Sequence, residues 1–163
     1  MSEHSKIKVA FICHGNICRS PMAKFIFLDM INKENLNDYF YVDSMATSRE
    51  EIGNGIYPYA KAELDKHNIN GYASHRAKQF TMKDYDEFDY IIVMDEMNKY
   101  NLMRIIKEDK DNKVHKLLDF TPNPKEIEDP WYSGNFEKVY KEIDNGCRCF
   151  LEYLKTKIKD WYD

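Results

Sequence analysis

The sequence predicts an α/β protein, a three-layer sandwich in which a four-stranded parallel sheet carries helices on both faces. Short apolar runs typical of buried strands alternate four times along the chain with segments whose apolar residues recur every three or four positions, as in helices. Such alternation favours a parallel sheet, because each strand returns to the next through a crossover helix. The chain has 163 residues, and we expect residues 1–163 to form a single domain.

The first strand, loop and helix are expected near the N-terminus. Residues 6–12 form an apolar run typical of a buried strand. The segment CHGNICRSP follows, in which Gly15 suits a turn and Pro21 suits the first turn of a helix. The helix then shows apolar positions three and four apart until about Asn35.

The later elements repeat this pattern. Further strands are expected over residues 39–43, 90–94 and 114–118. Further helices are expected from Pro58 to Asn70-Gly71, over MKDYDEF with Thr81 as N-cap, and from Asp95 to Ile106. The stretch TPNPKEIEDPWYSGN holds three prolines and a glycine, which predicts a long surface loop. The last helix has an apolar stripe from Phe136 to Trp161.

Composition narrows the classes of function. A formal net charge of −4 argues against nucleic acid as a partner, because that binding depends on many basic groups. No apolar run is long enough to span a bilayer, and no secretory leader opens the chain, so no membrane association is expected. Four cysteines are too few for a disulfide framework and are typical of free thiols in a reducing compartment. We therefore expect a cytoplasmic protein. We also expect it to be a monomer.

Cys13 stands where a parallel α/β sheet usually binds ligands, at the carboxyl end of a strand and before a helix N-terminus. Free backbone N–H groups and the helix dipole at that point attract anions. Together with Arg19 they are expected to favour the Cys13 thiolate, while the Arg19 guanidinium holds two phosphoryl oxygens. Ser20 could donate a hydrogen bond to the sulfur. The pattern predicts a phosphate-binding loop with a cysteine nucleophile, which needs no metal and no cofactor.

The Cys13–Arg19 spacing is a weak signal when taken alone. A buried cysteine at a strand end is more often an inert small hydrophobic residue. The succession of strand, glycine-containing loop, arginine, serine, proline and helix favours the functional interpretation.

Several motifs together resemble one enzyme family. CHGNICRSP after an N-terminal strand closely resembles the active-site loop of the low-molecular-weight protein tyrosine phosphatases. The segments VDSMATS, SHRAKQ, VMDEMN and DPWY are similar to later motifs of that family, in its order, so the resemblance spans nearly the whole chain. It implies the flavodoxin-like strand order 2-1-3-4. It also implies metal-independent hydrolysis of phosphotyrosine in proteins, and of small aryl phosphates, through a phosphocysteine intermediate.

The resemblance also implies roles for individual residues. Cys13 would be the nucleophile, Arg19 would bind phosphate, and Asp129 would protonate the leaving phenolate and then activate water. An isolated Asp-Pro pair would otherwise be an ordinary turn. The remaining residues of the phosphate-binding loop would be His14, Gly15, Asn16, Ile17, Cys18 and Ser20.

Supporting residues are implied beneath the loop. Asn16, Ser44 and His75 would form a hydrogen-bond network that aims the loop N–H groups inward. For Asp95 two interpretations stay open: it caps the following helix, or it orients groups near the site.

The other cysteines have separate expected roles. Cys18 would trap oxidised Cys13 as a reversible disulfide. Cys147 and Cys149 lie about 200° apart on one helix, so they are not a metal pair. We expect Cys147 in the core and Cys149 on the surface.

The substrate crevice departs from the family pattern. The resemblance places Glu50, Trp131 and Tyr132 at the crevice, where aromatic walls are common. Trp131 can stack on a phenyl ring, whereas Glu50 brings a negative charge that disfavours acidic sequence beside the phosphotyrosine.

Two alternatives come from other functional classes. Arsenate reductases share this fold and loop but relay electrons through further cysteines, and the chain has none between Cys18 and Cys147. A phosphotyrosine-binding module would cradle phosphate without turnover, but it would need neither Cys13 nor Asp129.

Overall fold

The computed structural model describes residues 5–162 of the chain. The strands are β1 (Ile7–Cys13), β2 (Phe40–Ala46), β3 (Tyr90–Val93) and β4 (Val114–Lys116). The α-helices are α1 (Arg19–Lys33), α2 (Pro58–Lys66), α3 (Met82–Glu87), α4 (Glu96–Ile106), α5 (Pro130–Ser133) and α6 (Phe136–Tyr162). Two short 3₁₀ helices are η1 (Asn37–Tyr39) and η2 (Leu117–Phe120).

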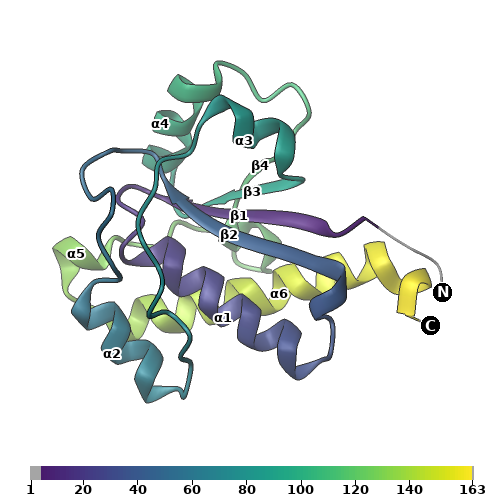
Figure 1. Ribbon diagram of the computed structural model, residues 1–163, viewed down its shortest axis with the longest axis horizontal. Helices are drawn as coiled ribbons and strands as arrows, with labels where there is room; N and C mark the ends of the chain where they lie inside the picture. The colour runs from purple at the N-terminus through teal and green to yellow at the C-terminus, as the bar shows by residue number, and fades with distance from the viewer. Residues whose placement is uncertain (1–4, 163) are drawn as a thin grey trace.

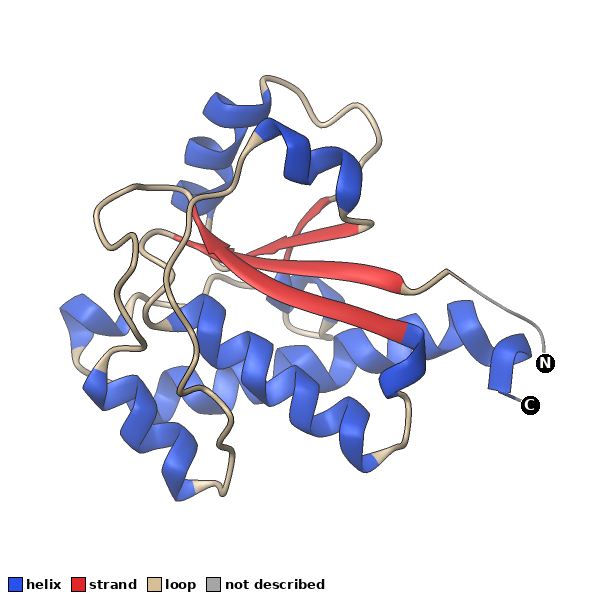
Figure 2. Ribbon diagram, viewed as in Figure 1, coloured by secondary structure: helices blue, strands red, loops and turns tan. Residues whose placement is uncertain are grey.

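The four strands form one parallel sheet in the order β2-β1-β3-β4, as predicted (Figure 2). Cys13 pairs with Ala46 at the end of β1 and β2, and Val93 pairs with Lys116 at the end of β3 and β4. The carboxyl ends of all four strands therefore meet along one edge, where the loops of the site gather.

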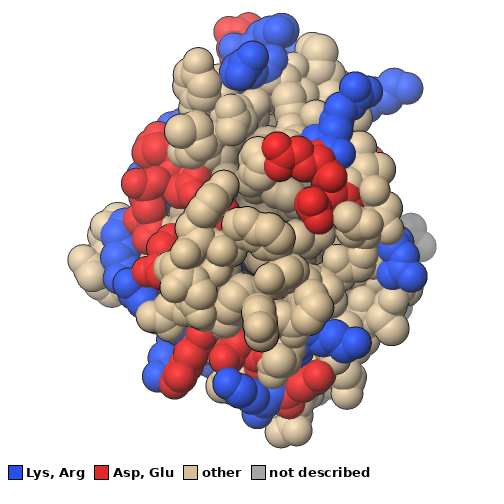
Figure 3. All heavy atoms as spheres, turned by 90° about the vertical axis from the view of Figure 1, so that its left-hand side faces the viewer, with Lys and Arg blue, Asp and Glu red and all other residues tan. Residues whose placement is uncertain are grey.

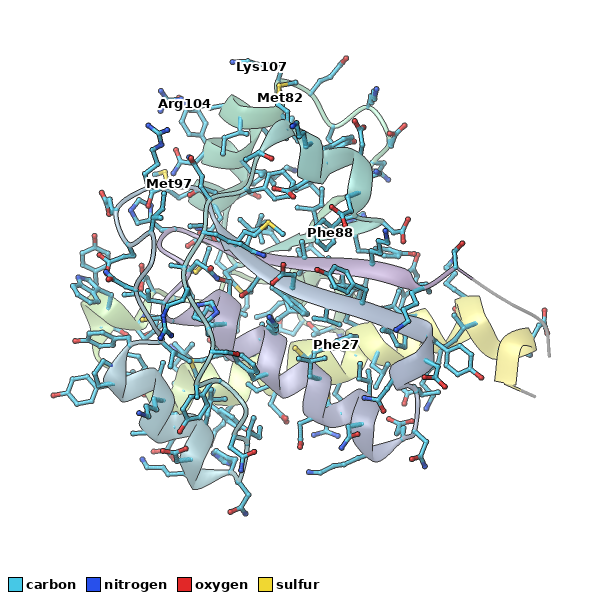
Figure 4. All side chains as sticks on the ribbon, viewed as in Figure 1. Phe27, Met82, Phe88, Met97, Arg104 and Lys107 are labelled. Atoms are coloured by element: carbon cyan, nitrogen blue, oxygen red, sulfur yellow. The ribbon has the colours of Figure 1, made fainter. Side chains whose placement is uncertain are left out.

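Helices cover both faces of the sheet, so the three-layer prediction is confirmed. α1, α2 and α6 lie on one side of the sheet, and α3 and α4 lie on the other (Figure 1). Phe11 and Ile12 are neighbours in β1 and point to opposite faces, as in any strand. Phe11 packs edge-to-face on Phe27 of α1, while Phe88 belongs to the core on the other face (Figure 4).

The long helix α6 has the apolar face that the sequence predicts. Its buried residues pack on α1 and on η2. Gly146 allows the approach to η2, since a Cβ at that position would lie 2.6 Å from Cγ of Leu117. Cys147 is fully buried, as expected, whereas Cys149 is only partly exposed. The side chain of Trp161 lies outside the described residues.

Three predicted boundaries are wrong. The second strand continues to Ala46, three residues past the predicted end at Asp43, because it stays paired with β1 as far as Cys13. The fourth strand ends at Lys116, because Leu117 and Leu118 leave the sheet in η2 to pack on the α1–α6 side. The helix that begins at Pro58 ends at Lys66, before Asn70-Gly71, because Asn68 takes a left-handed φ of 60°.

The predicted loop over residues 121–135 is long and largely irregular. It contains the single-turn helix α5, which begins directly after Asp129. None of the helices in the described part of the chain has the length and apolar character needed to cross a membrane.

Candidate active site

The segment after β1 wraps around the sulfur of Cys13. The backbone N–H groups of Asn16 and Ser20 donate to Cys13 Sγ at 3.3 and 3.4 Å, and Ser20 Oγ lies 3.0 Å from the sulfur. Asn16 takes a left-handed φ of 61°, which turns the loop back toward the start of α1. The sulfur therefore sits among donors that stabilise negative charge.

A buried hydrogen-bond network supports this loop from below. Nδ2 of Asn16 donates to Ser20 Oγ at 2.8 Å and to Ser44 Oγ at 2.9 Å, and Oδ1 of Asn16 accepts from the backbone N–H of Lys78 at 3.2 Å. Nε2 of His75 lies 2.8 Å from the carbonyl oxygen of Asn16. We call Asn16, Ser20, Ser44 and His75 the loop floor; each is at least nine-tenths buried.

The surroundings of His75 favour its neutral form. Burial lowers the pKa of His75 and outweighs the opposing hydrogen bond to Asn16. Because a carbonyl oxygen can only accept, the neutral ring carries its proton on Nε2 and donates it to the loop. His75 thus holds the loop.

Arg19 is the first residue of α1 and is only 2% exposed. Its Nη1 donates to Asp95 Oδ2 and to the carbonyl oxygen of Ile127, each at 2.7 Å, and its Nη2 lies 3.6 Å from Asp129 Oδ2. Burial alone would lower the pKa of Arg19, but the nearby Cys13 and Asp95 raise it above its ordinary value. The guanidinium is therefore a fixed cation beside the sulfur.

Asp95 serves in both of the ways that the sequence left open. Its Oδ1 accepts from the backbone N–H of Asn98 at 2.7 Å and so caps α4, while its Oδ2 accepts from Arg19. One carboxylate thus ties the start of a helix to the orientation of the guanidinium.

Asp129 is positioned by the helix that follows it. Its Oδ1 accepts from the backbone N–H of Trp131 at 3.0 Å, which makes Asp129 the N-cap of α5. The Trp131 ring lies 4.8 Å from the ring of Tyr57, centroid to centroid, and the Tyr57 N–H donates to the carbonyl oxygen of Ile17 at 2.9 Å. Tyr57 therefore links the Asp129 loop to the loop that follows β1.

The pocket at this edge of the sheet brings most of the predicted residues together. Its lining consists of Cys13, His14, Gly15, Ile17, Cys18, Arg19, Glu50, Glu51, Asp129, Trp131 and Tyr132. The floor residues Asn16, Ser20, Ser44 and His75 are not part of that lining and lie beneath it.

The rim of the pocket is exposed and partly acidic. We define the rim as His14, Glu50, Glu51, Trp131 and Tyr132. Nε2 of His14 lies 2.8 Å from Glu50 Oε2. Trp131 and Tyr132 are 53% and 85% exposed. Acidic side chains gather on the face of the molecule at the carboxyl ends of the strands (Figure 3).

Cys18 lines the pocket as a free thiol, and so does Cys13. Burial raises the pKa of Cys18, and the nearby Cys13 raises it further. The two sulfurs thus differ in setting, since the donors of the loop converge on Cys13. Within residues 5–162, no three His, Cys, Asp or Glu side chains are grouped as ligands for a metal ion.

Sequence reasoning missed several groups of the site. Glu51 lines the pocket beside Glu50. Its side chain packs closely against Gly15, since a Cβ added to Gly15 would lie 3.3 Å from Glu51 Cγ. Because Glu51 follows Glu50 directly in the sequence, its place at the pocket could have been predicted together with that of Glu50. The Ile127 carbonyl and the Lys78 N–H are backbone groups, which carry no signal in side-chain identity.

Comparison with known proteins places the chain in one family. A family profile described as "Low molecular weight phosphotyrosine protein phosphatase" matches residues 8–160. The chain is similar to proteins of that description from Sus scrofa (38% identical over 160 residues, 95% of this chain and 100% of the relative) and Homo sapiens (39% over 157 residues, 93% and 98%). It is similar in structure to YfkJ from Bacillus subtilis, with a TM-score of 0.89, 34% identity and coverage of 99% and 100%. The chain therefore belongs to the low molecular weight phosphotyrosine protein phosphatase family.

Proposed function

We propose that this protein hydrolyses phosphotyrosine in proteins, and small aryl phosphates, without a metal ion and through a phosphocysteine on Cys13. The observation that carries the proposal is the surroundings of the Cys13 sulfur. Backbone N–H groups and the Ser20 hydroxyl converge on Sγ, the Arg19 cation stands beside it, and Asp129 faces the same pocket. These are the groups that an ionised nucleophile, a phosphoryl group and a leaving phenolate require.

In the first step the Cys13 thiolate attacks phosphorus, an S–P bond forms and the bond from phosphorus to the phenolic oxygen breaks. Arg19 and the loop N–H groups hold the equatorial oxygens, where negative charge spreads in the transition state. Asp129 enters this step protonated and gives its proton to the departing phenolate.

In the second step water replaces the thiolate. The Asp129 carboxylate takes a proton from the water, the water oxygen attacks phosphorus, and the S–P bond breaks to give inorganic phosphate and the Cys13 thiolate. The Ser20 hydroxyl, 3.0 Å from Sγ, stabilises the thiolate as it leaves. Asp95 acts through Arg19, which it holds in place.

The rim supports an aryl phosphate as substrate. Trp131 and Tyr132 offer aromatic faces to a phenyl ring, whereas Glu50 and Glu51 repel acidic residues that flank the phosphotyrosine. Phosphotyrosine-containing proteins are therefore the proposed partners. We propose that the protein acts as a monomer in the cytoplasm, where its thiols stay reduced.

The test is hydrolysis of para-nitrophenyl phosphate and of a phosphotyrosine peptide at mildly acidic pH in EDTA. We expect the wild type to turn over both, Cys13→Ser to lose turnover, and Asp129→Asn to slow it by about 10² to 10⁴. Cys149→Ser is the matched control, because Cys149 lies in α6 outside the pocket, and it should keep full activity.

Two results would overturn the proposal. Undiminished turnover in Cys13→Ser would exclude the nucleophile. A folded, reduced wild type with no phosphatase turnover, which either binds phosphotyrosine or consumes thiols with arsenate, would indicate one of the two alternative functions.

A further inference from the structure

A second groove adjoins the active-site pocket. It lies between the loop that follows β2 and the C-terminal part of α4, and His14 lines both the pocket and the groove. Apart from Ile105, its lining is polar or basic and consists of His14, Thr47, Ser48, Asn101, Arg104 and Lys107. No lining residue is acidic, in contrast to the rim, where Glu50 and Glu51 stand.

The two strong cations of the groove have no acidic partner. Neither Arg104 nor Lys107 forms an ion pair with a carboxylate in the part of the chain that the structure describes. Arg104 extends from α4 toward the side of the molecule where the loop after β2 lies (Figure 4). Lys107 Nζ donates to the carbonyl oxygen of Arg104 at 3.1 Å, which complements the helix C-terminus. The Arg104 guanidinium is left available for an anion.

Thr47 supplies an independent sign of a ligand. It is 7% exposed, and its buried hydroxyl has no hydrogen-bond partner in the described residues. Its backbone is fully used, because its N–H donates to the carbonyl oxygen of Cys13 at 3.0 Å and its carbonyl accepts from Gln79 Nε2 at 3.0 Å. Buried hydroxyls are normally paired, so this one gains a hydrogen bond if its side chain turns toward a group in the groove that Thr47 lines.

The groove is coupled to the phosphate loop by backbone contacts. The N–H of Ser48 donates to the carbonyl oxygen of His14 at 3.1 Å, next to the Thr47–Cys13 bond. His14 lines both the groove and the pocket that contains Cys13, so the two cavities are neighbours on the surface.

We propose that this groove is a subsite for a second phosphate, carried on the same peptide as the phosphotyrosine. Arg104 can hold two phosphate oxygens with its planar fork, Lys107 adds a point charge, and Thr47 and Ser48 offer hydroxyl donors. This inference rests on the proposed function. The effect of the second phosphate on kcat/KM then depends on its position in the peptide, because the acidic rim repels a phosphate and the groove attracts one.

The experiment uses a set of phosphotyrosine peptides. Each peptide carries a single phosphoserine, placed at a different position within about four residues of the phosphotyrosine. The readout is the ratio of kcat/KM for each peptide to that of the same peptide with serine. We expect the wild type to prefer the doubly phosphorylated peptide at one or more positions by about threefold to tenfold at low ionic strength, and less in high salt.

Arg104→Ala should bring that ratio close to one, and Thr47→Val should lower it less. Lys99→Ala is the matched control, because it removes one positive charge from the same helix about 140° away from Arg104, and it should keep the ratio. Using a ratio within each protein removes any change in basal activity.

The outcomes separate this inference from the proposed function. A wild type that hydrolyses none of the peptides contradicts the proposed function itself. Normal turnover with no favoured position, or a preference that survives in Arg104→Ala, contradicts the subsite. Inorganic phosphate is titrated in parallel and followed by the backbone amide NMR signals of Thr47 and Asn101. Shifts of those signals without a peptide preference would indicate a site for free phosphate and overturn the proposal.

Discussion

The loop floor and the rim face opposite sides of the loop that follows β1, to which Asn16 and His14 themselves belong, and they differ in burial and in hydrogen bonding. The floor residues are buried and bonded to one another, with Asn16 alone contacting Ser20, Ser44, His75 and the backbone of Lys78. Rim side chains such as Trp131 and Tyr132 are exposed. We infer from this difference that, in the proposed reaction, the floor sets the geometry while the rim can vary with the substrate.

Of the variants that follow, Arg19→Lys should have the largest effect on kcat. A single ammonium cannot reproduce the contacts of the guanidinium with Asp95 and the Ile127 carbonyl while it also binds phosphate. We expect kcat for para-nitrophenyl phosphate to fall by about 10² to 10³. Arg148→Lys, at a surface pair with Asp144, is the control and should be neutral. A loss below tenfold for Arg19→Lys would contradict the proposed role of the clamp.

Asn16→Ala tests the floor by itself. The change leaves Ser44 Oγ and the Lys78 N–H without their partner and puts alanine at a φ of 61°. We expect the free energy of unfolding to fall by about 2 to 4 kcal/mol and kcat to fall by about 10 to 100-fold. Denaturant titration and steady-state kinetics measure the two quantities. Ser44→Ala removes one bond and should cost about 1 kcal/mol; equal losses in the two variants would argue against a network centred on Asn16.

Glu50→Gln tests the rim and should change selectivity alone. We expect the free energy of unfolding to stay within about 0.5 kcal/mol of wild type. For peptides with acidic residues beside the phosphotyrosine, kcat/KM should rise by about two- to fivefold, and the gain should shrink in high salt. Glu137→Gln, at an exposed pair with Lys141 in α6, is the control. The same gain for neutral and acidic peptides would show that the charge of Glu50 does not act on flanking residues.

The pH dependence of stability should show the smallest effect. Because burial lowers the pKa of His75 below its ordinary value of 6.5, the unfolded chain takes up the proton first as pH falls. This contribution therefore lowers the free energy of unfolding as pH falls below 6.5 and is absent above it. In denaturant titrations between pH 7 and pH 5, His75→Gln should lose less stability than the wild type. An identical loss would mean that His75 titrates normally.

Much of the fold follows from local sequence, and the failures have physical causes. The strand that ends at Cys13 and the helix that begins at Arg19 are marked by an apolar run, a glycine and a proline, all of which act locally. The predicted fourth strand is too long because it includes Leu117 and Leu118. An apolar run does not reveal whether it stays in the sheet or turns to pack on α6.

The site divides in the same way. Residues whose chemistry is unusual at their position, such as Cys13 and Arg19, were predicted as candidates from the sequence. Tyr57 was not, because its role depends on contacts with Ile17 and Trp131, which lie 40 and 74 positions away along the chain. Thr47 also gave no signal, since an unpaired hydroxyl can be recognised only after the fold is known.

The most direct test of the central claim is to trap the phosphoenzyme. Asp129→Asn protein is mixed with a dinitrophenyl phosphate, whose leaving group needs no proton, then quenched in acid, digested and examined by mass spectrometry. Because the variant lacks the base for the second step, we predict that the peptide containing Cys13 gains the mass of one phosphoryl group. In the Cys13→Ser protein we predict no phosphocysteine in the corresponding peptide. Turnover without a phosphorylated Cys13, or a phosphoryl group on another residue, would contradict the mechanism.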